Sequence, residues 1–588
     1  MNPNDKRNLT LIMTLLAVVG IASILCVWSL RNKSSAEPSA TTAVSTETSE
    51  TAEGQEVRIK LFETSDIHGY LVDTTSCDKQ TFQYRLARIA DFVSDARENP
   101  EYDDVILLDG GDCYQGATIS NMTNGAAVRA AMDIMDYDAV CLGNHEFDWG
   151  VTDYAAELDG TVPPYDVAGY IGDPNTPVLA SNLYYKETGE RVSFTKDYVI
   201  LDKAGCRIAV IGWIPDYSSS VIASRIEDYY IDMSTEHFAA RVHEIIEEES
   251  PDATIILCHE APVILSQDFT YEDVQVICGG HTHEDCVSVS DTAITLLQPN
   301  CQAKGFASAT IVIDAEGNVD IEDAEYTSIV DDPEETYFYD ESDLERFDIH
   351  ILDISDAVWD SLSEKMTEVL GYITEPVVEA DRTGDNTGTV IGNFYTKVML
   401  RATQEYGTQV AFFNNNGIRT EYPLNEGETE RNITVGDIYS IAPFGNTWLI
   451  YDLTAPELKQ HLINGLTQSR YGDQMTGLTF TFYNRGSADA PDFDIVSITL
   501  DDGTEIDMDD PNTTIRVCVS AYSASIEDSI FAGKVPVVSE SEGLIDNELM
   551  ISTLREMGRE NPNLEVDRSP RGRLVTQQEY EAYIADAA

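Results

Sequence analysis

Five short apolar runs in the first half of the chain each end in a cluster of polar side chains. Between them, residues 82–97 and 126–135 carry apolar side chains at helical spacing. Strands that alternate with helices predict a largely parallel sheet, and such a sheet places ligands beyond the carboxyl ends of its strands. The five clusters should therefore meet in space. They are Asp66-Ile67-His68, Gly110-Gly111-Asp112, Gly143-Asn144-His145-Glu146, His259-Glu260 and Gly280-His281-Thr282-His283.

The expected strands are residues 57–62, 105–108, 139–142, 207–212, 254–258 and 274–278. Five of the nine histidines follow such strands, beside Asp66, Asp112 and Asn144. A single zinc ion needs only four ligands, whereas seven candidates with a carboxylate able to bridge suit two ions about 3.5–4 Å apart. Such a pair activates water and neutralises a phosphate. The other four histidines are expected on helix surfaces or in a satisfied core: His237, His243, His350 and His461.

His145 and Asp148 lie three positions apart, so a carboxylate can orient an imidazole. This is the arrangement of general acid/base catalysis. We expect Gly143 to let the backbone turn sharply just before this pair.

The composition excludes one class of partner. The 588 residues include 104 acidic and 36 basic side chains, for a formal net charge of −68. A surface this acidic repels nucleic-acid backbones, so we expect no polymeric nucleic acid partner. It also repels small phosphorylated molecules, and a phosphate site would therefore need metal ions or placed arginines.

The first 33 residues predict a membrane-targeting segment. Lys6 and Arg7 precede an apolar run at residues 9–30, which is long enough to span a bilayer. We expect an uncleaved anchor, with a long signal peptide as the alternative. The protein would then lie outside the cytoplasm, held at the cell surface or secreted if the segment is cleaved, with no membrane contact elsewhere. Residues 34–56 predict a flexible, solvated stalk.

Changes in composition divide the remaining chain. We expect a catalytic domain at residues 57–330, a linker with a helix at 331–370 (the helix at 354–370), a second domain at 371–576 and a tail at 577–588. Four cysteines fall inside apolar runs and are expected to pack there as free thiols. These are Cys141, Cys258, Cys278 and Cys518.

The five clusters resemble those of the calcineurin-like metallophosphoesterases. Residues 414–419, Pro443-Phe444-Gly445-Asn446 and Pro570-Arg571-Gly572-Arg573-Leu574 resemble the second domain of the exported 5′-nucleotidases, a family that includes periplasmic UDP-sugar hydrolase and ecto-5′-nucleotidase. The resemblance implies an α/β fold: a calcineurin-like β-sandwich flanked by helices (αββα), a linker helix and a second α/β domain that binds substrate.

The resemblance also implies roles for individual residues. Asp66, His68 and His283 would hold one divalent ion, Asn144, His259 and His281 the other, and Asp112 would bridge. The ions would be zinc, manganese or similar divalent metals. His145, held by Asp148, would stabilise the transition state or protonate the leaving oxygen. Phe444 and Tyr522 match the aromatic rings between which the base stacks, Asp528 matches the ribose-binding acid, and Asn414, Arg419 and Asn446 match polar substrate contacts.

Two positions depart from the family pattern. Ile526-Glu527 replaces a glycine pair before Asp528, which changes the ribose side of the pocket. The phosphate-facing arginine is absent seven residues before Gly392, where Asp385 stands and Arg382 is three residues out of register. Phosphate binding would then rest more on Arg419 and the metals.

The leading hypothesis is a surface-anchored or secreted two-metal 5′-nucleotidase that releases phosphate from nucleoside 5′-monophosphates. Within enzymes, the alternatives are a 2′,3′-cyclic nucleotide phosphodiesterase and a nucleotide-diphosphate-sugar hydrolase. A non-catalytic nucleotide-binding surface protein is the alternative of another class. The oligomeric state and the preferred base stay open.

Overall fold

The computed structural model describes a single body built from two α/β domains. The described residues are 56–73, 82–148, 166–167, 170–171, 176–217, 221, 223–330, 346–378, 388–425, 427–468, 474–487, 490–526, 529–539 and 544–587. The predicted membrane segment, nearly all of the predicted stalk, Arg382, Asp385, Glu527 and Asp528 lie outside them. No helix in the described part of the chain is long and apolar enough to cross a bilayer.

The first sheet of the N-terminal domain carries three of the five predicted clusters. Its strand order is β16-β15-β1-β2-β3-β6, with β1, β2, β3 and β6 parallel and β15 and β16 antiparallel at one edge. The strands are β1 (Val57–Thr64), β2 (Asp104–Asp109), β3 (Ala139–Cys141), β6 (Val178–Leu179), β15 (Gly305–Ile313) and β16 (Val319–Ser328).

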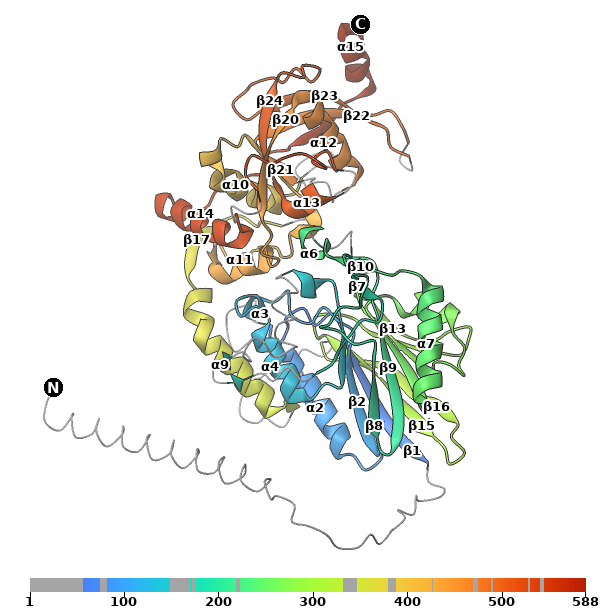
Figure 1. Ribbon diagram of the computed structural model, residues 1–588. Coiled ribbons are helices and arrows are strands. Elements are labelled where there is room, and N and C mark those ends of the chain that lie inside the picture. The colour runs from blue at the N-terminus through green and yellow to red at the C-terminus, as the bar shows by residue number, and fades with distance from the viewer. Residues whose placement is uncertain are drawn as a thin grey trace, which may run out of the picture. The chain divides into compact units, whose positions relative to one another are not determined.

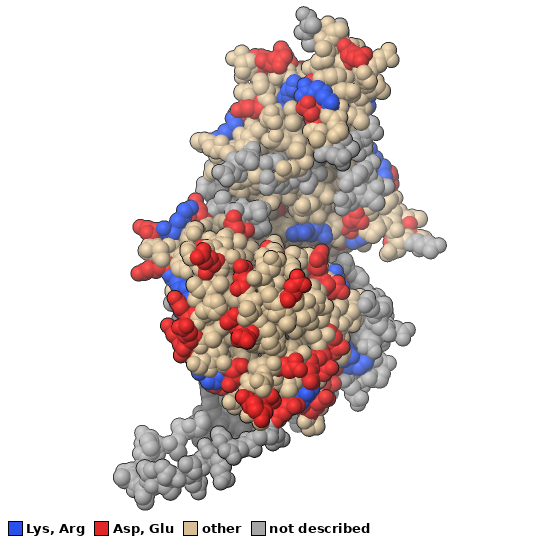
Figure 2. Space-filling view, turned by 90° about the vertical axis from the view of Figure 1, so that its right-hand side faces the viewer, with Lys and Arg blue, Asp and Glu red and all other residues tan. Residues whose placement is uncertain are grey.

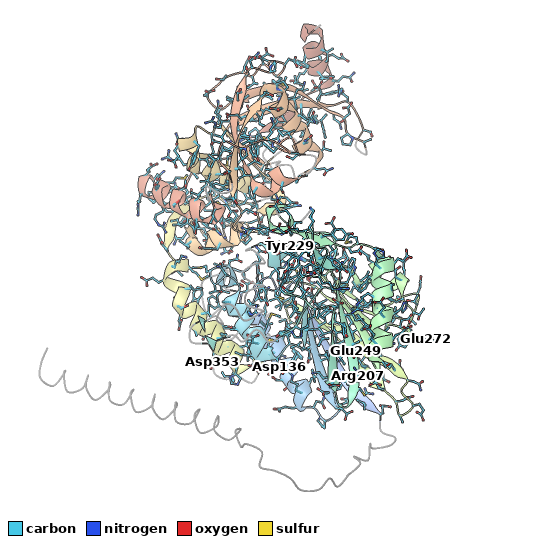
Figure 3. All side chains as sticks on the ribbon, in the orientation of Figure 1. Asp136, Arg207, Tyr229, Glu249, Glu272 and Asp353 are labelled. Atoms are coloured by element: carbon cyan, nitrogen blue, oxygen red, sulfur yellow. The ribbon has the colours of Figure 1, made fainter. Side chains whose placement is uncertain are left out.

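The second sheet carries the other two clusters. Its order is β13-β14-β12-β11-β9-β8, in which β9, β11, β12 and β14 run parallel and β8 and β13 are antiparallel edges. The strands are β8 (Tyr198–Lys203), β9 (Cys206–Trp213), β11 (Ala253–Cys258), β12 (Val276–Cys278), β13 (Asp285–Val289) and β14 (Thr295–Pro299). Arg207 and Glu249, labelled in Figure 3, form an ion pair of 2.6 Å where β9 begins.

The two sheets pack face to face and helices cover their outer faces (Figure 1). One buried cluster joins side chains of both sheets, including Ile59, Ile106, Val210 and Leu257. On the outer face of the first sheet lie α2 (Arg85–Glu98), α4 (Ala126–Met135) and α9 (Ile349–Met366), and on that of the second lies α7 (Thr235–Glu249). The αββα sandwich expected from the family resemblance is therefore confirmed.

The C-terminal domain is also α/β. A four-stranded sheet has the order β20-β24-β18-β21, and smaller sheets pair β17 with β19 and order β23-β22-β25. The strands are β17 (Val369–Ile373), β18 (Val410–Phe413), β19 (Arg431–Thr434), β20 (Trp448–Thr454), β21 (Gln474–Thr476), β22 (Leu478–Asn484), β23 (Phe493–Leu500), β24 (Thr514–Ser520) and β25 (Gly572–Leu574). The helices are α10 (Val390–Ala402), α11 (Val435–Ile441), α12 (Ala455–Thr467), α13 (Ala521–Ser525), α14 (Asp546–Glu560) and α15 (Gln577–Ala587).

Short elements complete the described fold. They are α3 (Thr118–Asn121), η2 (His145–Phe147), β4 (Asp166–Val167), β5 (Tyr170–Ile171), β7 (Leu183–Tyr185), α6 (Ala223–Ile226), β10 (Tyr229–Ile231), η3 (Pro262–Ile264), η4 (Ser266–Asp268), η6 (Gln404–Tyr406) and η7 (Asn415–Gly417).

Three expectations need correction. The helix expected at 354–370 ends at Met366, and the chain continues as β17 from Val369, where it pairs with β19. The parallel strands form two sheets rather than one. His461 is buried, but its Nε2 has no hydrogen-bond partner in the described structure, so it is not a satisfied core histidine.

Two expectations from composition hold. Cys141, Cys258, Cys278 and Cys518 are buried free thiols. Acidic side chains are scattered over the visible face of the N-terminal domain and gather toward its lower end, with few basic ones between them (Figure 2).

Candidate active site

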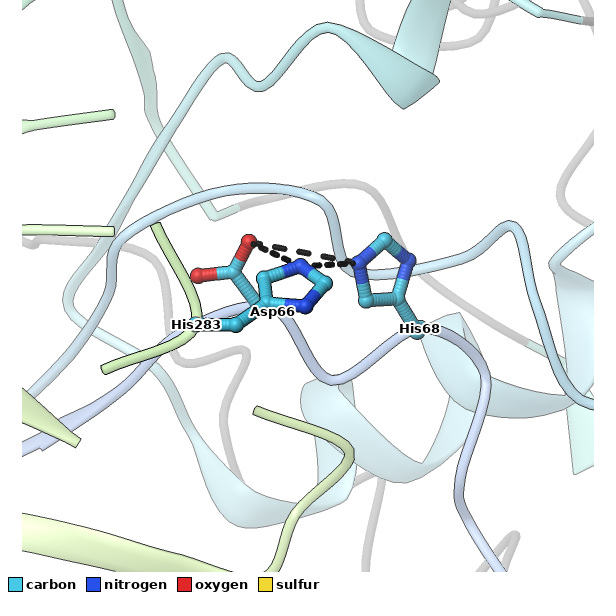
Figure 4. A group of neighbouring side chains, drawn as sticks. All are labelled: Asp66, His68 and His283. Carbon is cyan, nitrogen blue, oxygen red and sulfur yellow. Dashed lines mark hydrogen bonds and ion pairs between the residues drawn. The ribbon is translucent and has the colours of Figure 1, made fainter. Parts of the chain in front are cut away.

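Asp66, His68 and His283 form the first group of metal-ligand candidates (Figure 4). Asp66 Oδ1 lies 3.4 Å from His283 Nε2 and 3.9 Å from His68 Nε2, and the two Nε2 atoms are 3.0 Å apart. Asp66 and His68 follow β1 of the first sheet, whereas His283 follows β12 of the second. The face-to-face packing of the two sheets therefore brings this group together.

Asp112, His259 and His281 form the second group. Asp112 Oδ2 lies 3.2 Å from His259 Nε2, and the Oδ1 atom of Asn144 lies 3.3 Å from the same nitrogen. Carboxylate, imidazole and amide oxygen suit divalent ions such as zinc and manganese. All seven predicted ligands thus lie in two adjoining groups.

The backbone at these ligands is held in an uncommon conformation. Five of the seven have positive φ: Asp66 at 51°, His68 at 49°, Asp112 at 57°, His281 at 68° and His283 at 58°. Residues other than glycine rarely adopt this region, and such strain clusters at functional sites. The fold therefore holds these five ligand candidates in a backbone conformation that costs free energy.

Backbone carbonyls fix the orientation of two ligand rings. His68 Nδ1 donates to the carbonyl of Gln115 at 2.8 Å, and His259 Nδ1 donates to the carbonyl of Gly110 at 2.8 Å. Each ring then presents Nε2 to its group. Metal-binding histidines in proteins are usually fixed in this way.

His145 is held between two carboxylates. Its Nδ1 donates to Asp148 Oδ2 at 2.6 Å, and its Nε2 lies 4.0 Å from Asp112 Oδ2. Burial lowers the pKa of His145, but the charges of Asp148 and Asp112 outweigh this effect and the net shift of the pKa is upward. A proton-carrying imidazole beside the ligand groups suits donation to a leaving oxygen.

Glu146, which we did not assign a role from the sequence, joins two of the motif loops. Its carboxylate accepts hydrogen bonds from the backbone nitrogens of Gly143, Asp112 and Cys113, at 2.7, 3.0 and 2.8 Å. Burial, and then the charge of Asp112, raises the pKa of Glu146 to about 7. In the sequence, only its position four residues after the strand-like run at 139–142 could have indicated this role.

Gly143 serves a different purpose from the sharp turn that we expected. Its φ is not in the left-handed region, but a Cβ at this position would overlap Asp112. The absence of a side chain allows β3 to approach the loop that carries the bridging candidate.

A cavity of about 310 Å³, which we call cavity A, joins the ligand groups to the C-terminal domain. Phe444 stacks on His145, with 5.5 Å between ring centroids and an interplanar angle of 23°. The Arg419 guanidinium lies 4.9 Å from the centroid of Phe444 and has no ion pair among the described residues. Cavity A is lined by Asp112, Asn144, His145, Asp148, His281, His283, Asn414, Arg419, Phe444, Asn446 and Tyr522, together with Asn416 and Gly417, which we did not predict.

The predicted residues outside this lining have clear positions, with one exception. Asp66, His68 and His259 are almost fully buried. Asn414, which does line cavity A, is oriented by Ser520 and Ser523, whose hydroxyls donate to its Oδ1 at 3.5 and 3.4 Å. Asp528 lies outside the described residues.

Comparison with known proteins identifies both domains. Residues 59–285 match the family model of the calcineurin-like phosphoesterases, and residues 369–533 match that of the 5′-nucleotidase C-terminal domain. A trifunctional nucleotide phosphoesterase protein of Bacillus subtilis is 25% identical over 85% of this chain. The match covers only 34% of the length of that protein. A 5′-nucleotidase of Vibrio vulnificus is 24% identical, with 90% of this chain and 95% of that protein covered.

Solved structures show the same fold. The structure of a 5′-nucleotidase precursor from Thermus thermophilus superposes with a TM-score of 0.65 and 23% identity, covering 88% of this chain and 100% of that one. At this level of identity the likeness concerns the fold.

Proposed function

We propose a function on the premise that this chain belongs to the 5′-nucleotidase family, in which a calcineurin-like phosphoesterase domain precedes the 5′-nucleotidase C-terminal domain. The chain is accordingly a metal-dependent phosphoric monoester hydrolase. Its proposed reaction is the release of phosphate from nucleoside 5′-monophosphates, with two divalent ions as cofactors.

The observation that carries this proposal is the composition of cavity A. Its lining combines metal-ligand candidates and His145 of the N-terminal domain with aromatic and amide side chains of the C-terminal domain. Phe444 and Tyr522 are only half-buried and belong to none of the hydrophobic clusters. A base can therefore stack on them, whereas a core role would bury them.

Different residues of the chain would have different roles in this reaction. The two ligand groups would hold the ions, which when bound supply neutralisation of the phosphate charge and activation of a water molecule. Arg419, which forms no salt bridge among the described residues, would bind the phosphate oxygens as a charge-assisted donor. His145, oriented by Asp148, would give a proton to the leaving 5′-oxygen.

Substitution of the two aromatic residues tests the nucleotide assignment. Stacking of one base on an aromatic side chain contributes about 1–3 kcal/mol. Tyr522→Ala and Phe444→Ala should therefore each raise the KM for a nucleoside monophosphate roughly ten- to a hundredfold.

The matched comparison is a small aryl phosphate, which has no base to stack. Tyr522→Ala should hydrolyse it nearly as the wild type does, whereas Phe444→Ala also loses the ring that packs on His145 and should lose some turnover. Equal losses toward both substrates in Tyr522→Ala, in parallel with a lower melting temperature, would remove the base-stacking role.

The proposed location is outside the cytoplasm, with residues 9–30 as membrane anchor. Fractionation of cells that produce the full chain, before and after protease treatment of intact cells, tests this. We expect the protein in the membrane fraction and accessible to protease from outside. Soluble protein inside the cell would contradict the proposal.

A further inference from the structure

One of the six strands that the sequence predicts ends without a ligand cluster. Clusters follow five of these strands, whereas the run at 207–212, which lies within β9, continues into Trp213-Ile214-Pro215-Asp216-Tyr217. In the second sheet β9 lies beside β11 and runs parallel to it. Because parallel strands end at the same edge of a sheet, Tyr217 follows β9 at the edge where His259 follows β11.

Tyr217 contacts the loop that follows β3 at two points. Its hydroxyl donates to the backbone carbonyl of Leu142 at 2.6 Å. Its ring packs against Phe147, with 5.9 Å between the centroids and an interplanar angle of 65°. Leu142 and Phe147 lie on either side of Asn144 and His145 in the sequence. The two contacts therefore hold the segment that carries a ligand candidate and the proposed proton donor.

The ring of Tyr217 also packs against His259. The two rings meet edge to face, with 6.1 Å between the centroids and an interplanar angle of 74°, an arrangement that aromatic pairs favour. The hydrogen bond from His259 Nδ1 to the carbonyl of Gly110 fixes one edge of the imidazole, and the contact with Tyr217 restricts its tilt. Tyr217 therefore contacts one ligand candidate directly and holds the loop that carries Asn144.

The backbone around Tyr217 is itself anchored. Asn182 follows β6 of the first sheet and is 4% exposed. Its Oδ1 accepts a hydrogen bond from the backbone nitrogen of Ile214 at 3.1 Å, and its Nδ2 donates to the carbonyl of Ile214 at 2.7 Å. The carbonyl of Tyr217 accepts from the backbone nitrogen of Val221 at 3.0 Å. A tyrosine held in this way can fix the position of its neighbours.

We propose that Tyr217 is a positioning residue for the second ligand group, in which it sets the place of Asn144 and the orientation of His259. Tyr217 has no exposed surface and does not line cavity A, so it acts through these neighbours rather than on the substrate. Residues that orient metal-binding side chains contribute to metal affinity. The inference rests on the proposed function, in which Asn144, His259 and His281 hold one of two ions.

The affinity of each ligand group for zinc, measured separately, tests this role. His68→Ala weakens the first group, so that the second can be titrated by itself, and His281→Ala does the reverse. In each background Tyr217→Phe removes the hydroxyl and keeps the ring. The measurement is calorimetric titration of the metal-free full chain with zinc.

In the His68→Ala background, Tyr217→Phe should weaken zinc binding roughly three- to tenfold, the effect of one lost hydrogen bond. Tyr217→Leu, which also removes the ring from His259, should weaken it roughly ten- to a hundredfold, the range for loss of a group that orients a metal ligand. In the His281→Ala background, Tyr217→Phe should leave the affinity of the first group unchanged.

Tyr422→Phe is the matched control. Tyr422 is also fully buried, and its hydroxyl donates to the backbone carbonyl of Asp437 in the C-terminal domain at 2.8 Å. The control should lower the melting temperature of the metal-free chain about as much as Tyr217→Phe does, because each variant loses one buried hydrogen bond. It should change the zinc affinity of neither group, which separates positioning from a general loss of stability.

Equal weakening of both ligand groups by Tyr217→Phe would overturn the inference, and so would unchanged affinity of both groups. Tyr217 would then be a residue of the hydrophobic core and nothing more. Because the readout is metal affinity rather than turnover, failure of the proposed function is seen separately. A wild-type chain that binds two ions but hydrolyses no nucleoside monophosphate would contradict the proposed function and not the role of Tyr217.

Discussion

Asp112 makes close contacts through both of its carboxylate oxygens and belongs to two groups of ligand candidates. Its Oδ1 accepts a hydrogen bond from the backbone nitrogen of His145 at 2.7 Å, and its Oδ2 faces His259 at 3.2 Å. It belongs both to the group with His68 and His145 and to the group with His259 and His281. These contacts support its assignment as the bridging ligand.

Asp112→Asn should lower the metal content and reduce turnover by at least about a hundredfold, the scale for loss of electrostatic stabilisation at a reacting centre. An amide is neutral and cannot offset the charge of two cations. Metal analysis and phosphate release on one preparation check this. Near-wild-type turnover would exclude the bridging role.

His461 is a buried residue of the second domain and does not line cavity A. Its ring packs edge-on against Phe412 and Phe531, at centroid distances of 4.4 and 5.2 Å. Burial lowers the pKa of His461 to about 3. The folded state therefore favours the neutral form of His461. Because the folded pKa lies below the unfolded one, the stability that comes from burying the neutral ring is complete above about pH 6.5 and is lost as the pH falls toward 3.

Between pH 7 and 5 the wild type should lose about 2 kcal/mol of unfolding free energy through His461, at about 1.4 kcal/mol for each pH unit below 6.5. His461→Phe keeps an aromatic ring but has no proton to take up, so this part of the loss should vanish. Denaturant unfolding at both pH values measures it. An equal loss of unfolding free energy between pH 7 and 5 in the wild type and in His461→Phe would contradict the role given to His461.

The loops that follow β2 and β3 are the elements on which the site depends most directly. Glu146 joins them through three backbone amides, and β3 approaches the Asp112 loop because Gly143 has no side chain. Neither contact could be predicted from the sequence, because both depend on the backbone of a distant loop. The five ligand clusters could be predicted, because apolar runs mark the strands and the ligands follow at once.

The pattern of strands did not determine how they pair. Ile59, Ile106 and Val210 all lie in apolar runs, yet the first two belong to one sheet and the third to the other. Alternation along one strand does not identify its neighbours. The sandwich was expected from the family resemblance, whereas the strained backbone of the ligands is known only from the structure.

Glu146→Ala should destabilise the loop pair, because three buried backbone donors would lose their acceptor at a cost of roughly 1–3 kcal/mol each. Glu146→Gln, the matched control, keeps one carbonyl acceptor and should retain much of the stability. Thermal unfolding and metal affinity of both variants check this. Equal behaviour of the two variants would indicate that charge, rather than hydrogen bonding, is the contribution of Glu146.

At the scale of the whole molecule, two α/β domains each supply part of the candidate site. The N-terminal domain provides the ligand groups between its two sheets, and the C-terminal domain provides Arg419, Phe444 and Tyr522. With a net charge of −68, the molecule repels phosphorylated substrates at long range. Attraction must come from the ions and Arg419 at short range, so the ions are central to this account.

The most direct test follows metal content and phosphate release from a nucleoside 5′-monophosphate on one sample of the full chain. We expect about two divalent ions per chain, loss of hydrolysis as a chelator removes them, and recovery when zinc or manganese is returned. Hydrolysis that continues after both ions are gone, or a fully loaded chain that hydrolyses no phosphate ester, would contradict the account.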